Sequence, residues 1–162
     1  LGSLADYESN AVLGRALNDD DRGVRMLAES GLRSLWCRWG DEGQRQRLGL
    51  AIRANVARRH HEAIVRATEL IVEAPSFAEA WNQRAIAYFA TGRCAESIDD
   101  CKQTLEVNPY HFGAAAGMGQ CYLQLGRPRL ALESLRRALL LNPDLAGVRA
   151  NVVALERSLG KA

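Results

Sequence analysis

Apolar side chains recur at helical intervals in two neighbouring stretches near the middle of the chain. In the first stretch the spacing is i, i+4, i+7, at Trp81, Ala85 and Tyr88. In the second stretch the spacing is i, i+3, i+7, at Ile98, Cys101 and Leu105. Both spacings place the apolar residues on one face of an α-helix. Gly92 lies between the stretches and Pro109 follows the second, so the pattern predicts two helices joined by a tight turn.

The same pattern returns at a fixed distance along the chain. Pro75, Pro109 and Pro143 follow one another at equal intervals. A shift by this interval also places residues of matching type on one another: Ala80 on Ala114, Ala85 on Gly119, Tyr88 on Tyr122, Gly92 on Gly126, Ser97 on Ala131 and Leu105 on Leu139. A fixed period of this kind indicates a repeat architecture. One such unit cannot bury its apolar face alone, so the units are expected to stack.

Small residues stand where the two helices of a unit would cross. They are Ala85 and Ser97 in one unit, and Gly119 and Ala131 in the next. Small side chains allow two helix backbones to approach closely, and Trp81, Tyr88 and Tyr122 are expected to fill the space between units. Gly92 is expected to adopt a positive φ, and Pro128 suits the first turn of a helix.

These residues resemble the tetratricopeptide repeat, a helix-turn-helix unit whose signature is W-x₂-L-G-x₂-Y, then A-x₃-F, then P, and whose length equals the interval between the prolines. The middle unit matches at Trp81, Ala85, Tyr88, Ser97 and Pro109 and departs at Arg84 and Cys101. The third unit carries Met118, Gly119, Tyr122, Ala131, Leu135 and Pro143, with Ala115 in place of Trp. The first unit is weaker, with Arg47, Ala54 and Arg58 where Trp, Tyr and the turn Gly are usual.

The resemblance implies an all-α helical-hairpin solenoid. Its three units would be residues 44–77, 78–111 and 112–145, followed by a capping helix at 146–162. Residues 1–43 precede the units, and residues 1–3 resemble the remnant of a purification tag. Residues 4–20 suit either a short helix or a frayed tail.

A further helix is expected before the units, with Asp21 as its N-cap. Its predicted apolar face is broad and consists of Val24, Leu27, Ala28, Leu32, Leu35, Trp36 and Trp39. One interpretation is that this helix caps the weak first unit. The other is that Trp36 and Trp39 anchor a partner.

Composition and charge narrow the class of protein further. Hydrophobic residues make up 48% and charged residues 25%, and the net charge is +2, which is ordinary for a folded domain and does not by itself favour nucleic acid. The four cysteines contain no C-x-x-C pair, so reduced thiols in an intracellular, reducing compartment are expected. No cofactor or metal site is expected, because His60 and His61 are adjacent and point in different directions on a helix.

No motif for catalysis is present, and the chain is expected not to be an enzyme. The predicted function is a scaffold or adaptor that binds a peptide or a helix of another protein. In the resembled family, ligands lie along the concave surface formed by the first helix of each unit. The corresponding positions are Arg45, Leu48, Ile52, Asn55, Glu79, Asn82, Ile86, Phe89, Ala116, Gln120 and Leu123. The competing interpretation is that the chain's own N-terminal segment fills this groove.

Two further expectations concern partners. Related helical solenoids bind single-stranded RNA, and arginines are frequent near the start of the chain, so an RNA-binding repeat protein is the alternative function. Members of the resembled family that grip acidic chaperone tails use Lys, Asn and Arg, but the matching positions here are uncharged: Leu48, Ile52, Gln83, Gly113 and Gly117. Binding to such tails is therefore not expected. The acidic pair Asp99 and Asp100 is expected to lie on a solvated face.

Overall fold

The computed structural model describes the fold of residues 2–160 and the side chains of residues 9–160. Leu1, within the predicted tag remnant, and residues 161–162, at the end of the predicted capping segment, lie outside the described residues. The described helices are α1 (Gly2–Ala16), α2 (Arg22–Cys37), α3 (Glu42–Val56), α4 (His60–Glu73), α5 (Ala78–Ala90), α6 (Cys94–Val107), α7 (Phe112–Gln124), α8 (Pro128–Leu141) and α9 (Ala146–Leu159). No strand occurs between residues 2 and 160.

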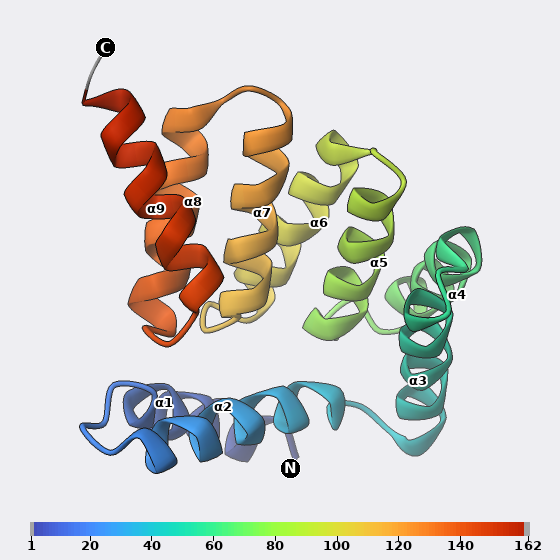
Figure 1. Cartoon of the computed structure of the whole chain (residues 1–162). Helices are drawn as coiled ribbons and strands as arrows, with labels where there is room; N and C mark the ends of the chain where they lie inside the picture. The colour runs from blue at the N-terminus through green and yellow to red at the C-terminus, as the bar shows by residue number, and fades with distance from the viewer. Residues whose placement is uncertain (1, 161–162) are drawn as a thin grey trace.

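Three helical hairpins stack side by side, as Figure 1 shows. They are α3 with α4, α5 with α6, and α7 with α8, and α9 packs against α8. The first helices contact one another in order, α3 with α5 and α5 with α7, so they form one continuous layer. The second helices α4 and α6 pack against the first helix of the following hairpin. This arrangement confirms the predicted helical-hairpin solenoid.

The turns inside the hairpins share one backbone geometry. Gly92 has φ +76° and Gly126 has φ +65°, as the glycine pattern predicted. Arg58 stands at the equivalent place in the first hairpin and adopts φ +58°, which side-chain-bearing residues rarely occupy. The turn geometry is therefore a property of the repeat, and the first hairpin keeps it without glycine.

The predicted close approach of helices is also present. A Cβ atom on Gly119 would lie 2.6 Å from Cγ of Leu135, so α7 and α8 leave no room for a side chain at that position. In the middle hairpin, Ser97 Oγ donates to the backbone oxygen of Ala85 at 2.8 Å. Both Ala85 and Leu135 are buried. Small residues therefore let the two helices of the middle and third hairpins pack closely.

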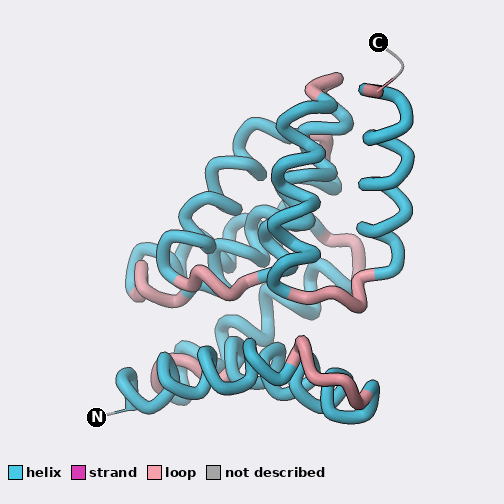
Figure 2. Tube along the Cα trace, turned by 90° about the vertical axis from the view of Figure 1, so that its left-hand side faces the viewer, coloured by secondary structure: helices cyan, strands magenta, loops and turns pink. Residues whose placement is uncertain are grey.

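The N-terminal helices α1 and α2 lie across one end of the stack, beneath the lower ends of α5, α7 and α9 (Figures 1 and 2). Residues 2–16 form a helix, so of the two predictions for residues 4–20 the helix is the one observed. Asp21 caps α2 by accepting from the backbone N–H of Gly23 at 2.6 Å. The pair of helices will be called the N-terminal arm.

The arm contacts more of the stack than the sequence predicted. Trp39 packs against the core of the first hairpin, but Trp36 packs against Phe112 at the start of α7. The broad apolar face predicted for α2 is wrong in part, because Leu27 is 75% exposed and Val24 is also exposed. The buried residues of α2 are Ala28, Leu32 and Trp36, so only a narrow stripe of this helix is covered.

Candidate functional site

A groove runs along the layer of first helices and is closed at its foot by α2. It encloses about 400 Å³. Its walls come from α3, α5 and α7, and its foot comes from the C-terminal half of α2. The residues that line the groove include Arg33, Trp36, Cys37, Ile52, Glu79, Asn82, Ile86, Phe89, His111 and Gln120.

Six of the residues predicted to bind a partner line this groove. They are Ile52, Glu79, Asn82, Ile86, Phe89 and Gln120. The side chain most open to solvent among them is Ile86, which is 42% exposed, and Phe89 beside it is half-buried. An exposed aliphatic residue next to a half-buried aromatic residue is a surface that a ligand can cover.

The other five predicted residues do not line the groove. Leu48 is only 1% exposed, so the prediction that it contacts a partner is wrong, because it packs into the core of the first hairpin. Arg45 is exposed and donates to the backbone oxygen of Gly40 at 2.6 Å. Asn55 donates to Gln83 Oε1 at 3.0 Å. Ala116 and Leu123 pack against hydrophobic clusters of the second and third hairpins.

The buried carboxylate of Glu79 lies at the foot of the groove. Its oxygens accept hydrogen bonds from Asn82 Nδ2 at 2.9 Å, from Gln83 Nε2 at 2.7 Å and from His111 Nε2 at 2.9 Å. Burial raises the pKa of the Glu79 carboxyl, but the hydrogen bond and the charge of His111, followed by the hydrogen bonds from Gln83 and Asn82, outweigh it and hold the pKa below its usual value. Glu79 is therefore ionised at neutral pH.

The hydrogen bonds of His111 define its protonation. Its Nδ1 accepts the backbone N–H of Ala114 at 3.0 Å and so caps the start of α7. The ring proton is then on Nε2, which donates to Glu79. His111 thus joins the carboxylate of Glu79 on α5 to the start of α7.

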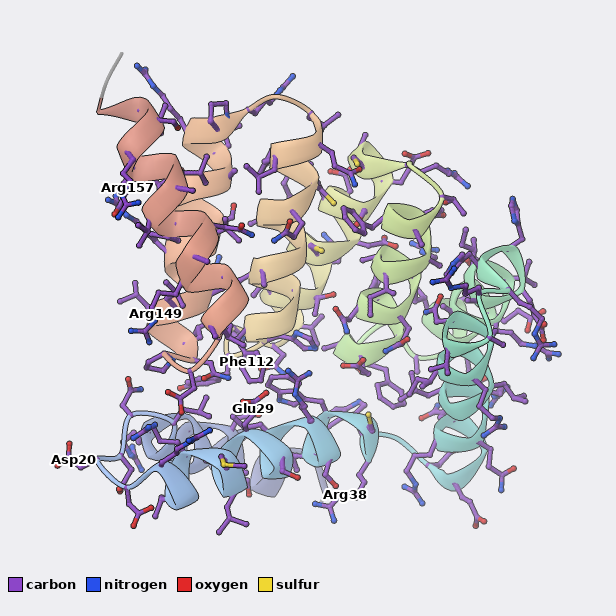
Figure 3. All side chains as sticks on the ribbon, in the orientation of Figure 1. Asp20, Glu29, Arg38, Phe112, Arg149 and Arg157 are labelled. Atoms are coloured by element: carbon purple, nitrogen blue, oxygen red, sulfur yellow. The ribbon has the colours of Figure 1, made fainter. Side chains whose placement is uncertain are left out.

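The N-terminal arm closes the foot of the groove through Trp36. The indole of Trp36 stacks on His111, with ring centroids 4.2 Å apart and planes 22° apart. Its Nε1 donates to Asn10 Oδ1 of α1 at 2.8 Å. Figure 3 shows Phe112 at the lower end of α7 pointing toward α2. The arm thus covers one end of the groove but does not cover Ile86 and Phe89 on the wall of the groove. The chain's own N-terminal segment therefore does not fill the whole groove.

Sequence reasoning missed His111, Trp36 and Cys37 as groove residues. One signal was present for His111, because the equivalent positions one repeat before and one repeat after it are Phe77 and Leu145, both apolar. Burial, and then the nearby Glu79 charge, raises the pKa of Cys37 to about 11. This thiol on the groove wall is therefore protonated at neutral pH and a poor nucleophile.

A buried ion pair inside the middle hairpin corrects the prediction for Asp100. Asp100 is 4% exposed, whereas its neighbour Asp99 faces solvent as predicted. The guanidinium of Arg84 donates to both Asp100 oxygens, at 2.7 and 2.8 Å, and to Thr68 Oγ1 at 3.0 Å. Arg84, which departs from the repeat signature, thereby joins three helices.

Three findings bear on other functional classes. Within the described part of the chain no group of three or more His, Cys, Asp or Glu residues could hold a metal ion. None of the helices described between residues 2 and 160 combines the length and apolar character that a bilayer crossing requires. Cys37, Cys94, Cys101 and Cys121 are all free thiols.

Comparison with known proteins agrees with this fold. Residues 76–141 match the family model described as Tetratricopeptide repeat. A TPR repeat-containing protein of Rhizobium etli is 36% identical over 75 residues, which are 46% of this chain and 37% of that protein. The human Superkiller complex protein 3 is 30% identical over 82 residues, which are 51% of this chain and 5% of that protein. The chain thus spans well under half the length of these relatives.

Solved structures share the architecture at low sequence identity. The TPR domain of Arabidopsis OM64 superposes with a TM-score of 0.69 at 20% identity, over 72% of this chain and 96% of that one. MamA gives a TM-score of 0.69 at 16% identity, over 88% of this chain and 86% of that one. The first TPR domain of Spaghetti (RPAP3), bound to an HSP90 peptide, gives 0.65 at 21% identity, over 68% and 87%.

Proposed function

We propose that this chain is a non-catalytic interaction module that holds a peptide segment or a helix of a partner protein in the groove between α3, α5 and α7. The observation that carries the proposal is the open apolar wall formed by Ile86 and Phe89 above a polar foot. Apolar anchors with a few convergent polar groups are typical of peptide-binding grooves. Solved relatives in fold include domains bound to HSP90 and HSP70 peptides, which supports a peptide as the class of ligand.

The proposed ligand is not an acidic chaperone tail. The positions that would donate to a terminal carboxylate include Gly113 and Gly117, which have no side-chain donor. Gln83 already donates to Glu79, and the Glu79 charge itself would repel a second carboxylate. An acidic tail therefore lacks both donors and favourable electrostatics in this groove.

The test is affinity selection of a random peptide library on the immobilised chain, followed by titration of selected peptides. We expect Phe89→Ala to weaken the selected peptides by about 1–3 kcal/mol, because binding energy concentrates in a few central anchors. Leu140→Ala is the matched control, since Leu140 is 79% exposed on α8 and does not line the groove. Selected peptides that bind Phe89→Ala as well as the parent would contradict the proposal.

RNA is the alternative ligand, and the same material tests it. Several N-terminal arginines are engaged in ion pairs, for example Arg25 with Asp144 at 2.7 Å and Arg33 with Glu29 at 2.9 Å. A titration with random single-stranded RNA at increasing salt separates the two functions, because binding to phosphates weakens steeply with salt. RNA binding that Phe89→Ala leaves unchanged, with no peptide selected, would favour the alternative.

A further inference from the structure

The groove contains a buried carboxylate, and none of the described lysine or arginine side chains forms an ion pair with it. Glu79 is 6% exposed, and its three hydrogen-bond donors are the side-chain amides of Asn82 and Gln83 and the imidazole of His111. A cation that enters the groove would be attracted to this carboxylate, because charges away from bulk water are screened only weakly. The position of Glu79 in the first turn of α5 also favours its ionised form through the helix dipole.

The one arginine among the groove's lining residues, which include no lysine, is already engaged elsewhere. Arg33 of α2 pairs with Glu29 at 2.9 Å and lies over the ring of Phe112, 4.9 Å from its centroid. The side chain of Arg33 is 55% exposed, so it stands at the rim and not at the foot. The other groove residues on α2 and on the α6–α7 turn are Trp36, Cys37 and His111, and none of them is a lysine or an arginine.

We infer that the groove selects a peptide carrying a lysine or arginine side chain that reaches Glu79, a conclusion that rests on the proposed function. The cation neutralises the carboxylate while an apolar residue of the same peptide covers Ile86 and Phe89. The inferred ligand is therefore positively charged where it meets the groove, whereas an acidic chaperone tail is negatively charged.

The distance between the two contacts predicts the spacing in the ligand. Ile86 is seven residues beyond Glu79 on α5, so the two positions are about 10 Å apart along the helix axis. An extended peptide rises about 3.3 Å per residue, which places its basic residue about three positions from its apolar anchor. A helical ligand lying along α5 would place them about seven positions apart.

The experiment uses N-acetylated, C-amidated random peptides, so that only a side chain can supply the cation. We expect the peptides selected on the intact chain to be enriched in Lys or Arg. The basic residue should lie about three positions from an apolar residue in an extended peptide, or about seven positions from it in a helical one. Glu79→Gln should weaken these peptides about tenfold or more, because a hydrogen bond to a charged group is lost. The control Glu106→Gln, on the exposed face of α6, removes the same charge and should leave binding unchanged.

A ligand-side change keeps the test valid if Glu79→Gln folds poorly. Replacing the basic residue of a selected peptide by norleucine should then weaken binding to the parent chain by the same factor. Peptides that depend on Phe89 but show no preference for a basic residue would overturn this inference and leave the proposed function standing. If no selected peptide depends on Phe89, the proposed function and this inference both fail.

Discussion

The middle hairpin and the third hairpin have the same backbone geometry but different interiors. Both place a positive-φ glycine in the turn and a small residue at the helix crossing. The middle hairpin nevertheless buries the Arg84–Asp100 ion pair and the Glu79–His111 hydrogen bond. At the equivalent positions one repeat later, the third hairpin has uncharged residues: Met118 for Arg84, Ser134 for Asp100 and Gly113 for Glu79.

Side-chain volume also differs between the two hairpins in a compensating way. The middle hairpin pairs Ala85 with Cys101, whereas the third pairs Gly119 with Leu135. In the third hairpin the larger Leu135 therefore occupies the space that the missing side chain of Gly119 leaves. The comparison teaches that turns and small residues determine the backbone of the repeat, while the buried charges of the middle hairpin are additional to it.

The largest expected effect comes from breaking the buried ion pair. Asp100→Ala should destabilise the chain by roughly 3 kcal/mol, because it leaves the guanidinium of Arg84, whose side chain is 15% exposed, without its counter-charge. Asp99→Ala is the matched control, since the Asp99 side chain is 76% exposed, and it should change stability by less than about 0.5 kcal/mol. Urea denaturation measures both values.

Replacing the buried ion pair of the middle hairpin by the equivalent residues of the third hairpin tests whether the pair is needed for stability. The double variant Arg84→Met with Asp100→Ser removes both charges together, and such replacements are often close to neutral. We expect it to recover most of the stability lost in Asp100→Ala. A double variant as unstable as Asp100→Ala would show that the pair itself is required for the fold.

The next effect concerns packing at the helix crossing of the third hairpin. Gly119→Ala should destabilise by about 1–2 kcal/mol, because overpacking against the fully buried Leu135 outweighs the better helix propensity of alanine. Adding Leu135→Cys, which copies the middle hairpin, should restore part of the loss. Thermal unfolding of the single and double variants tests this, and an unchanged midpoint for Gly119→Ala would refute it.

A smaller effect of opposite sign is expected in the first hairpin. Arg58→Gly should stabilise the chain by about 0.5–1 kcal/mol. The steric strain that a side chain causes at φ +58° would be removed, and this gain exceeds the larger conformational entropy that glycine gives the unfolded chain. The reverse change, Gly92→Arg in the middle hairpin, should destabilise by a similar amount. The two denaturation midpoints should therefore shift in opposite directions.

The smallest expected effect is a dependence of stability on pH. The pKa of Glu79 is below its ordinary value of 4.5, so the unfolded chain takes up this proton at a higher pH than the folded chain does. The stabilisation is therefore complete above about pH 4.5 and is lost as the pH falls through the lower pKa of the folded state. Cys37, with a pKa of about 11, does not titrate in this range.

The measurement compares the parent with Glu79→Gln by denaturation between about pH 6 and about pH 3. The difference in stability between the two should shrink as the pH falls, because only the parent carries the carboxyl. A difference that stays constant across this range would show that the folded state does not favour the ionised form of Glu79.

Much of the fold was predictable because its signals are local. The repeat period, the glycine turns and the proline positions report backbone geometry within one hairpin, so the sequence alone indicated the solenoid. Six of the residues that line the groove were identified from their positions within the repeat. Leu48 was assigned to the groove in the same way but packs into the core. The first hairpin diverges from the repeat signature, so the position alone could not show where this side chain points.

What the tertiary structure decided is where distant segments meet. The helical pattern of α2 predicted an apolar face but not the surface against which this face packs. Trp36 contacts His111, which lies two hairpins further along the chain, and this contact could not be predicted from the pattern. The same holds for Glu79 and His111, and for Arg84 and Asp100, because a charged residue at a repeat position looks solvated until its partner is known. Periodicity determined the local helices and turns by itself; only the packing of one hairpin on the next, and of the arm across them, determined which polar groups are buried together.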